Sequence, residues 1–562
     1  ISGRVSVKNC IVWGNGRYEG YNQLEVSEEV INSVVEGGYE GGTNIITENP
    51  LLMPLDYYGG NVKVMPVSTG SSAIGICSTE SVEPPATDAL GNVRGDVYGA
   101  GAVEFLGSAE YVYASSERSK YISGKEFEIE ALISGEAESY QWYKDGVEID
   151  GATERVLKVS QSERSAVYTV KVIVGGNTVT SEGITIETRP GIVYVSGSGN
   201  DEKDGSSWEN AKATLQSALS ECAYGSQIWV KSGEYDFGGE IELVEGVYIY
   251  GGFSGTEKSL EERVDGSETV ISGGGTHRIF GAYSIVDAKL EGLTLTEGKC
   301  DIGSVLYLES SENILIKGVK ITGNESDSQI WVCNYSKVNI TDSQISNNTG
   351  RGIGIDGNAQ VEIERSVFES NISEPNGGAI AAVNSSVVTI EESEFIGNES
   401  TSRYGGAISA DGSSTYTITG SRFEGNKANG NGGAIYHSGS SVLIDGCEFI
   451  SNETRYGNGG AIYADGWRSM SYENSTFIGN IAELGGAIYS YSKFTGYGYL
   501  INNTFSGNEA KDLVGDVINS YWNSNLTLLN CTVVGNNTEG GRGSAISGRV
   551  SVKNCIVWGN GR

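Results

Sequence analysis

The chain has 562 residues, which is more than one ordinary domain needs and enough to bury a large core. A formal net charge of −34 disfavours nucleic acids and anionic membranes as partners, and no apolar run approaches the roughly 20 residues that span a bilayer. Glycine is abundant, at 81 residues, and proline is scarce, at 7, so the composition favours short strands and tight turns over a disordered linker or collagen.

The first seventeen residues, ISGRVSVKNCIVWGNGR, recur without a mismatch at residues 546–562. An identity of this length indicates duplication, and it predicts that the chain is a slice of a longer tandem array, cut slightly beyond one period. The lack of an initiator Met fits an internal fragment. The alternative is a self-contained protein with a short duplicated segment at each end.

Residues 111–189 differ in sequence pattern from the rest of the chain, and this pattern predicts a β-sandwich. The stretch YQWYKDGVEI places Trp142 on a strand before a Lys-Asp-Gly turn, and SERSAVYTVKV places Tyr168 two residues before Val170. These residues resemble the core Trp and the tyrosine corner of an immunoglobulin-like domain. The bridging cysteines of that domain are missing, and we expect Ala131 and Val170 in their places. A spacer is the expected role, with ligand binding as the alternative.

Residues 192–219 predict a strand, a loop rich in Asp and Gly, and an amphipathic helix that begins near Trp208. Asp201 and Asp204 in that loop are candidate Ca²⁺ ligands, although their spacing is not that of an EF-hand. The alternative is a polar turn that caps the helix. We expect no other cofactor.

The second half of the chain is visibly periodic. A GGAI-type motif recurs every 26 to 28 residues, with its first glycine at Gly377, Gly405, Gly432, Gly459 and Gly485. An F-x-x-N motif lies between these copies, as in FIGN, FEGN and FISN. A period of this length without helical periodicity is typical of a β-solenoid.

Alternation within each repeat identifies the strands. In SSVLIDGCEFISN, Val442 and Ile444 share one face, and Cys447 and Phe449 share a face after a Gly turn. Each coil therefore has about three short strands. Because parallel crossovers are right-handed, the coils are expected to stack as a right-handed parallel β-helix that rises about 4.8 Å per coil.

Stacking predicts columns of equivalent residues. The Asn column, whose amides are expected to bond along the stack at a turn where Asn tolerates unusual backbone angles, contains Asn398, Asn426, Asn452, Asn480, Asn508, Asn536 and Asn560. The Phe column contains Phe395, Phe423, Phe449, Phe477 and Phe505. Cys447, Cys531 and Cys555 share an inward column with serines, where free Cys is expected to behave as a small hydrophobe.

A third column follows the GGAI motif. Tyr436, Tyr463 and Tyr489 occupy the same position in successive coils, next to an Ile that points inward. We therefore expect an exposed ladder of rings, which is a candidate surface for stacking on sugar rings or on a neighbouring filament. The alternative is that the rings shield the strands.

The alternating GGAI and F-x-x-N motifs resemble those of chlamydial polymorphic membrane proteins and of other right-handed β-helix surface proteins of bacteria. The stretch at 192–219 resembles the opening of such β-helices, and VVEGGYEGGTNIITENPLL with ATDALGNVRGDVYGAGAVEF, within 34–105, resembles their closing segment. The closing segment comes first here. This order implies that 1–110 finish one β-helix, that 111–189 form an Ig-like spacer, and that 192–562 begin the next β-helix.

Parallel β-helices also include pectate lyases and polygalacturonases, so an enzyme must be weighed. Polygalacturonase-like sites depend on an Asp-Asp pair, which this sequence lacks, and Glu394, Arg422 and Glu448 are better explained as an outward ion ladder than as an acid–base cluster. With only two His and no C-x-x-C, a Ser-His-Asp triad, a zinc site or a disulfide framework is not expected. We therefore predict no catalytic residues.

The expected function is that of an extracellular, cell-surface structural protein. Tandem β-helix and Ig-like units would form a long fibre for adhesion or surface coating, with neighbouring copies of the unit as partners. A polysaccharide or a neighbouring cell surface is the other expected partner. The alternatives are a β-helix that binds or cleaves polysaccharide, and a non-covalent filament of single units.

Overall fold

A computed structural model of the chain describes residues 2–14, 24–26, 28–58, 63–78, 85–105, 111–160, 164–263, 266–466, 469–512, 516–538 and 544–560. It contains two compact units. The first comprises Ile1–Gly191 with Cys222–Tyr224, and the second comprises Ile192–Glu221 with Gly225–Arg562. Among these described residues, the regular elements of both units are β-strands, except for the helix α1 (Leu215–Ser220) and the 3-10 helix η1 (Leu260–Glu262) of the second unit.

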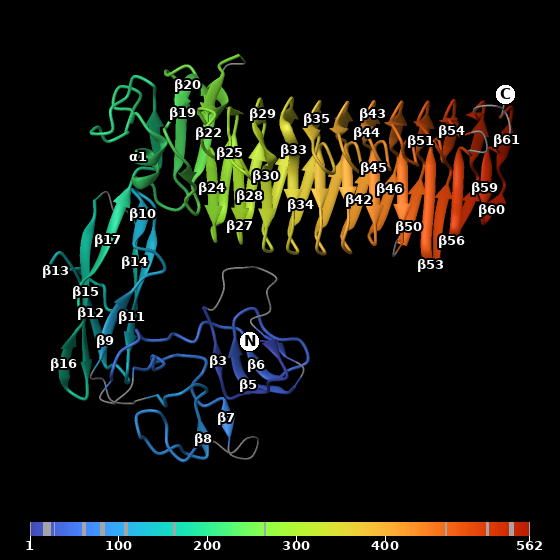
Figure 1. Ribbon diagram of the computed structural model, residues 1–562. Coiled ribbons are helices and arrows are strands. Elements are labelled where there is room, and N and C mark those ends of the chain that lie inside the picture. The colour runs from blue at the N-terminus through green and yellow to red at the C-terminus, as the bar shows by residue number, and fades with distance from the viewer. Residues whose placement is uncertain are drawn as a thin grey trace. The chain divides into compact units, whose positions relative to one another are not determined.

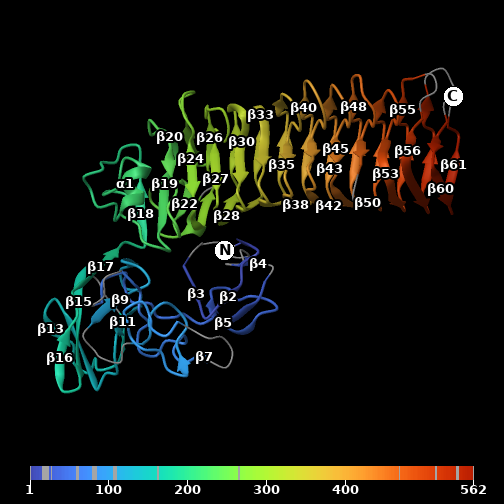
Figure 2. The ribbon, with the colours of Figure 1, turned by 60° about the horizontal axis from the view of Figure 1, so that its bottom comes forward.

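The second unit is a parallel β-helix, whose strands lie side by side from β18 to β61 in Figures 1 and 2. One face is a 13-stranded parallel sheet. Its strands, in order, are β20 (Gly233–Asp236), β23 (Thr269–Ser272), β26 (Thr294–Thr296), β29 (Lys320–Thr322), β32 (Gln344–Ser346), β35 (Val367–Glu369), β39 (Glu394–Ile396), β43 (Arg422–Glu424), β47 (Glu448–Ile450), β51 (Thr476–Ile478), β54 (Thr504–Ser506), β57 (Thr532–Val534) and β61 (Ile556–Trp558).

The remaining strands of the solenoid form a 31-stranded sheet that wraps around its other faces. The column that follows the GGAI motifs contains β21 (Ile241–Glu242), β24 (Phe280–Tyr283), β27 (Leu306–Glu309), β30 (Glu325–Cys333), β33 (Thr349–Ile355), β37 (Ile380–Ala382), β41 (Ile408–Ala410), β45 (Ile435–Ser438), β49 (Ile462–Asp465), β53 (Ile488–Ile501), β56 (Ile518–Leu529) and β59 (Ile546–Gly548). The next column contains β18 (Ile192–Val195), β19 (Gln227–Lys231), β22 (Tyr248–Phe253), β25 (Val286–Glu291), β28 (Glu312–Lys317), β31 (Lys337–Thr341), β34 (Gln360–Glu364), β38 (Val387–Glu391), β42 (Thr415–Thr419), β46 (Ser441–Asp445), β50 (Ser469–Glu473) and β60 (Val550–Lys553), with β53 and β56 spanning both columns. Short strands that follow the F-x-x-N motifs are β36 (Ile372–Ser373), β40 (Glu399–Ser400), β44 (Lys427–Ala428), β48 (Glu453–Thr454), β52 (Ile481–Ala482), β55 (Glu509–Ala510) and β58 (Asn537–Thr538).

The phenylalanines stack face to face along the interior. From Phe368 to Phe505, successive ring centroids are 4.7 to 5.0 Å apart with interplanar angles of 4 to 10°. This spacing equals the rise between parallel strands, so the period of the sheet sets the distance between the rings. All these rings are fully buried.

The buried asparagines form a continuous hydrogen-bonded ladder. Asn452 is typical: its Nδ2 donates to Asn480 Oδ1 at 2.9 Å and to Phe423 O at 2.9 Å. Its Oδ1 accepts from the backbone N–H and Nδ2 of Asn426, at 3.0 and 2.9 Å. Every polar atom of the buried amide is thereby satisfied. The ladder begins at Asn324 and extends to Asn560.

Two details of the columns differ from expectation. The left-handed residue at the turn is the one before each Asn, such as Gly425 (φ +63°) or Ser451 (φ +53°), because the Asn side chain must point inward to bond along the stack. The Cys column is also polar: Ser421 N–H donates to Cys447 Sγ at 3.5 Å, and Cys447 N–H donates to Ser475 Oγ at 3.0 Å. Each small side chain in this column therefore accepts an amide of the preceding coil.

The two glycines of the GGAI motif are required for different structural reasons. Gly432 adopts a φ of +73°, which side chains disfavour. Gly433 packs so closely on the next coil that an added Cβ would lie 2.0 Å from Gly460 O. The motif thus marks the place where successive backbones approach each other most closely.

In the first unit, residues 112–189 form two packed sheets. One sheet has the order β14 (Val156–Val159), β11 (Phe127–Ile133), β9 (Val112–Ser115). The other has the order β10 (Lys120–Ile122), β17 (Ile184–Arg189), β15 (Ala166–Val174), β12 (Ser139–Lys144), β13 (Val147–Glu148), with β16 (Asn177–Thr180) also paired to β15. Their common core contains Trp142, Tyr168, Ala131 and Val170, all at most 1% exposed. Tyr168 Oη has no partner among the described residues, and residues 161–163, just upstream of it, lie outside them.

The start of the chain also forms stacked parallel strands. β5 (Val30–Val35) pairs in parallel with β2 (Val7–Lys8), β3 (Ile11–Val12) and β6 (Thr43–Ile46), and β1 (Ser2–Gly3) pairs with β4 (Glu25–Val26). The segment that follows contains the antiparallel pair β7 (Cys77–Ser78) and β8 (Val97–Tyr98). There Asp88 accepts hydrogen bonds from Leu90, Asn92 and Glu104 amides, so this carboxylate organises the loop.

Candidate binding surface

The predicted tyrosine column is present, but Tyr463 and Tyr489 are buried and Tyr436 is partly buried. Tyr436 and Tyr463 stack with centroids 5.4 Å apart, and Tyr463 and Tyr489 stack at 5.3 Å. Tyr404, from the preceding turn, extends the stack at 4.5 Å from Tyr436. Tyr463 is 8% exposed and Tyr489 is 6% exposed. The expectation of an exposed ladder is therefore wrong, because each ring covers the face of the next.

Burial keeps the hydroxyls of this column protonated. It raises the pKa of Tyr436 and that of Tyr489 to about 12, and it also raises the pKa of Tyr463, to which nearby Asp465 contributes. The column therefore acts as a neutral, apolar band along the β45, β49 and β53 face.

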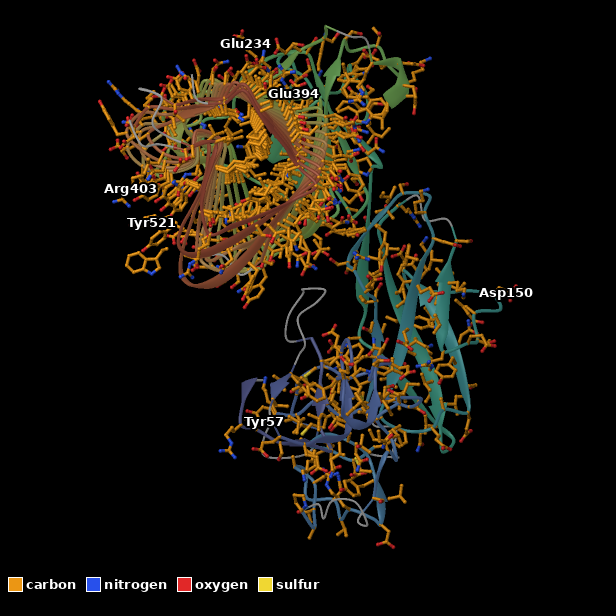
Figure 3. All side chains as sticks on the ribbon, turned by 90° about the vertical axis from the view of Figure 1, so that its right-hand side faces the viewer. Tyr57, Asp150, Glu234, Glu394, Arg403 and Tyr521 are labelled. Carbon is orange, nitrogen blue, oxygen red and sulfur yellow. The ribbon has the colours of Figure 1, made fainter. Side chains whose placement is uncertain are left out.

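The column ends in aromatic rings that are exposed. Tyr521 on β56 lies 6.5 Å from Tyr489 and 6.2 Å from Tyr491, and Trp522 lies 6.2 Å from Tyr491, all between centroids. Tyr521 is 52% exposed and Trp522 is 58% exposed. Figure 3, which looks along the solenoid, shows Tyr521 projecting outward from it. These rings offer open faces, which the predicted residues do not.

A groove lies on the adjacent face of the solenoid, and we call it the aromatic groove. Its volume is about 320 Å³. Its lining includes the outward-facing Thr417, Leu443 and Ser471 of β42, β46 and β50, and the rings of Tyr497 and Tyr499 from β53. Both rings are about half exposed or more. Aromatic walls beside hydroxyl groups are suited to the mixed apolar and polar faces of a sugar ring.

A second, larger groove of about 620 Å³ lies near the start of the solenoid. Its lining includes Arg263, Glu268 and Lys320. Arg263 pairs with Glu291, and Glu268 accepts a hydrogen bond from Thr294 Oγ1 at 2.7 Å, so two of these charged groups are held by neighbours. The groove can offer opposite charges to a polar ligand, but its groups are engaged in ordinary surface pairs.

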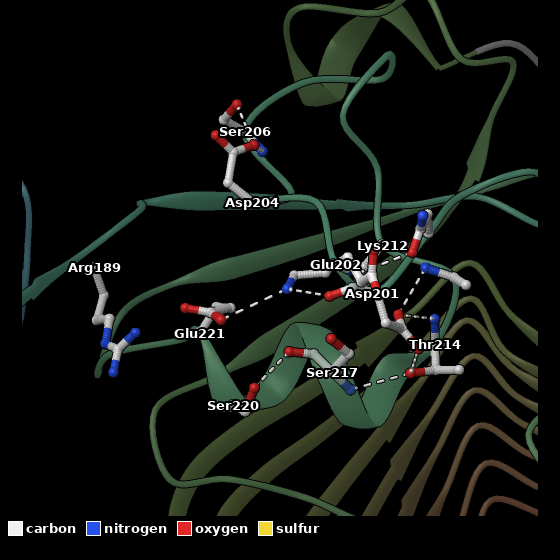
Figure 4. Close-up of polar contacts among 12 residues, drawn as sticks. Arg189, Asp201, Glu202, Asp204, Ser206, Lys212, Thr214, Ser217, Ser220 and Glu221 are labelled. Atoms are coloured by element: carbon white, nitrogen blue, oxygen red, sulfur yellow. Dashed lines mark hydrogen bonds and ion pairs between the residues drawn. The ribbon is translucent and has the colours of Figure 1, made fainter.

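The candidate Ca²⁺ ligands have local partners, shown in Figure 4. Asp201 accepts from the backbone N–H groups of Ala213 and Thr214, at 2.8 and 2.9 Å, and from Thr214 Oγ1. Burial opposes its ionisation, but these bonds outweigh that effect and lower its pKa. Asp204 accepts from Ser206 N–H and Oγ. Asp201 thus braces Thr214, the N-cap of α1. Among the described residues, no group of three metal-ligating side chains is present.

The outward charges on the Phe-bearing face form an ion ladder. Glu394, Arg422 and Glu448 stand in register, and Arg422 lies 3.6 Å from Glu448. Arg422 also pairs with Glu424 at 2.6 Å. Arg422 thus offsets part of the negative charge of the neighbouring carboxylates at the surface.

Sequence reasoning missed the exposed aromatics. The periodic pattern gave no signal for them, because they lie on β53 and β56, which extend over 14 and 12 residues where other coils turn. Tyr497, Tyr499, Tyr521 and Trp522 belong to these two strands, whose spacing departs from the GGAI repeat.

Comparison with known families identifies the solenoid. The model of the right-handed beta helix region matches residues 244–395, 365–514 and 406–562, which together exceed half of the chain. The chain belongs to this family. The predicted right-handed parallel β-helix is thereby confirmed, whereas the narrower resemblance to chlamydial repeats and the Ig-like nature of residues 111–189 stay predictions.

Solved β-helix structures are similar to the chain at low identity. An α-1,3-glucanase catalytic unit from Streptomyces thermodiastaticus has 14% identity and a TM-score of 0.41, covering 76% of this chain and 86% of that one. A family 28 exopolygalacturonase from Yersinia enterocolitica has 11% identity and a TM-score of 0.31, covering 80% and 99%. PfbA, a surface adhesin of Streptococcus pneumoniae, has 13% identity and a TM-score of 0.32, covering 62% and 87%. No curated protein matches the chain.

These matches correct one prediction. Most of the similar β-helix structures are carbohydrate-active enzymes, so the expectation that this chain is not an enzyme is contradicted. At such identities the matches establish the fold and not an activity. Among the described residues, no helix has the length and apolar character needed to cross a membrane.

Proposed function

We propose that this chain is part of an extracellular, cell-surface protein in which β-helices alternate with Ig-like spacers along a fibre, and that the fibre serves adhesion or surface coating. The observation that carries the proposal is the order of structures in the chain. Stacked parallel strands at 2–46 come first, two packed sheets at 112–189 follow, and a second stack of coils begins at β18.

The sheet order supports an Ig-like assignment for the spacer. A three-stranded sheet faces a sheet in which β15 lies between β17 and β12, which corresponds to the F strand between G and C. Trp142 on β12 is fully buried, and its Nε1 donates to Glu154 O at 2.9 Å. Ala131 and Val170 fill the core in place of a disulfide, as packing alone requires.

The interior ladders support a structural role. Bonded Asn side chains extend over most of the solenoid, and stacked Phe rings span its middle from Phe368 to Phe505, which gives a stiff scaffold whose surface can vary without loss of the core. The acidic surface, with a net charge of −34, favours solubility outside the cell. The likeness of the repeats to chlamydial polymorphic membrane proteins is in keeping with this proposal.

Labelling of intact source cells with antibodies to the solenoid tests the location. We expect the cell surface to be labelled without permeabilisation and electron microscopy to show fibres. Labelling that requires lysis would contradict the proposal.

A second candidate function, polysaccharide binding, is favoured by the aromatic groove. Tyr497 and Tyr499 present 66% and 48% of their surface to solvent on a rigid face. We expect the chain to be retained on an immobilised polysaccharide and the double variant Tyr497→Ala/Tyr499→Ala to bind roughly 10-fold more weakly or worse. Tyr456→Ala is the matched control, because Tyr456 is 71% exposed and does not line the groove. Equal retention of both variants would contradict this role, and release of reducing-end or unsaturated products would identify turnover.

A further inference from the structure

The two identical seventeen-residue copies have different environments. In the second copy, β60 and β61 are the last strands of their sheets, and no described residue pairs with them on the far side. Val552 is 45% exposed, Val557 is 48% exposed and Trp558 is 74% exposed. In the first copy, the equivalent Val7 and Val12 are 3% and 4% exposed. The same two valines are thus buried in the first copy and open in the second, and Trp13, the equivalent of Trp558, is partly buried.

Residues 28–46 cover the first copy. Val7 stands beside Val30 on β5, and Ile11 and Val12 stand beside Val34 and Val35. Val7 N–H donates to Glu29 O at 2.9 Å, and Val34 N–H donates to Cys10 O at 2.9 Å. β5 is therefore the next coil on this sequence.

The polar ladders seen at the end of the solenoid have counterparts around the first copy. Cys531 N–H donates to Cys555 Sγ in the solenoid, and Cys10 N–H, the equivalent of Cys555, donates to Ser33 Oγ at 3.1 Å. The small-residue column therefore has the same hydrogen-bond pattern around both copies of the seventeen-residue sequence.

A second column of asparagines lies on the outside of the coils and contains Asn474, Asn502 and Asn530. It has a counterpart in the first unit. Asn530 Nδ2 donates back to Asn502 Oδ1 at 3.2 Å, and Asn32 Nδ2 donates back to Asn9 Oδ1 at 3.3 Å. Asn9 is the equivalent of Asn554. Two independent ladders, on different sides of the strand, thus share one register at both ends of the chain.

We propose that the coil at residues 546–560 is the docking surface for residues 24–46 of a further copy of this sequence. Val552 and Ile556 would pair with Val30 and Val34 of that copy, and Cys555 N–H would donate to its Ser33. The docked strand would cover Trp558. The biological setting of this contact rests on the proposed fibre.

Charge complementarity supports the same occupant. Lys8 Nζ lies 2.7 Å from Glu29 Oε2, and Arg4 Nε lies 3.2 Å from Glu28 Oε1. Lys553 and Arg549 are the equivalents of these two basic residues. An acidic pair at the start of the docking strand therefore meets a basic pair on the exposed coil.

Hydrogen exchange on an extended chain tests the inference. Peptides from residues 1–17 and 546–562 are identical in mass, so the present chain should give two isotopic envelopes, one slow and one fast. When residues 18–105 are appended after Arg562, we expect the fast envelope to disappear, with exchange of the second copy reduced roughly 100-fold so that it is at least as slow as the first. Peptides from 24–46 of the two copies should likewise merge.

The matched control carries Val34→Asp in the appended copy alone, because Val34 is fully buried in its own coil. We expect this control to restore the fast envelope. An extended chain that keeps the fast envelope, whether its appended segment is folded or not, would overturn the inference. Cell-surface labelling does not depend on this contact, so the two proposals can fail separately.

Discussion

The solenoid and the sandwich solve the same problem, burial of a β-sheet face, with different interiors. The sandwich packs apolar side chains of unlike shape around Trp142. The solenoid places a hydrogen-bonded Asn column and a Ser/Cys column beside its apolar columns. Because its coils resemble one another, apolar packing alone would distinguish poorly between registers, whereas a slipped Asn would lose its partners. A repetitive fold thus uses polar groups for specificity where a globular domain uses shape.

The largest expected effect comes from breaking the Asn ladder. Asn452→Ala removes the side-chain bonds to Phe423 O, Asn480 Oδ1 and Asn426 Nδ2 and takes the acceptor from the buried Asn426 backbone N–H, which should destabilise the solenoid by about 3–6 kcal/mol around that coil. Hydrogen exchange of β47 and its neighbours measures the loss. Glu448→Ala in the same coil, which removes an exposed and weakly paired carboxylate, should cost less than about 1 kcal/mol. Equal effects of the two variants would mean that the ladder does not specify the stack.

In the sandwich, the shape of one side chain has the corresponding role. Trp142→Ala should destabilise this region by about 3–5 kcal/mol, because a fully buried ring is replaced by a cavity. Trp142→Phe retains most of the packing but leaves Glu154 O without its indole donor, and it should cost about half as much or less. Thermal unfolding followed by exchange of β12 and β15 distinguishes these outcomes. A loss of protection in the solenoid as well would show that the two interiors are not independent.

An acid-sensitive group lies in the solenoid core. His437 Nε2 lies 2.6 Å from Tyr472 Oη, and burial lowers the pKa of His437 to about 3. His437 is therefore protonated below about pH 6.5 in the unfolded chain but only below about pH 3 in the native chain. Stability should fall as the pH falls through this window, by about 2–3 kcal/mol at pH 4.5.

His437→Met removes this titration while keeping the volume of the side chain. The difference in unfolding free energy between the native sequence and this variant should change by that amount between pH 7 and pH 4.5, because the carboxylates that begin to titrate near pH 4.5 are common to both chains and cancel in the difference. A constant difference would show that His437 is protonated in the folded chain.

The periodicity of the sequence predicted which residues form columns, whereas the burial and the hydrogen bonds of those residues depend on contacts between coils. The Phe and Asn positions follow from the repeat because each coil places the same residue on the same face. The covering of Tyr463 depends on rings in the adjacent coils, and the hydrogen bonds of Cys447 depend on backbone groups of adjacent coils. The aromatic groove arises where β53 departs from the repeat, so no periodic pattern could indicate it.

The smallest expected effect is a Gly→Ala change that should cost the same free energy in both regions but alter hydrogen exchange over different lengths of chain. Gly479 in the solenoid and Gly146 in the sandwich hairpin both adopt left-handed backbone, with φ of +63° and +77°. An added Cβ meets nothing closer than 3.5 Å at Gly479 and nothing within 4 Å at Gly146. Gly479→Ala and Gly146→Ala should therefore each cost about 1 kcal/mol through backbone strain alone.

The two variants should differ in how far their effect extends. In the sandwich, which unfolds as one unit, every strongly protected amide should exchange about fivefold faster than in the native sequence. In the solenoid, where each coil contacts its neighbours, the acceleration should be confined to coils next to β51 and fade within a few repeats. Acceleration along the whole solenoid would mean that its ladders couple the coils into a single cooperative unit, and the contrast between the two interiors would then be one of chemistry and not of cooperativity.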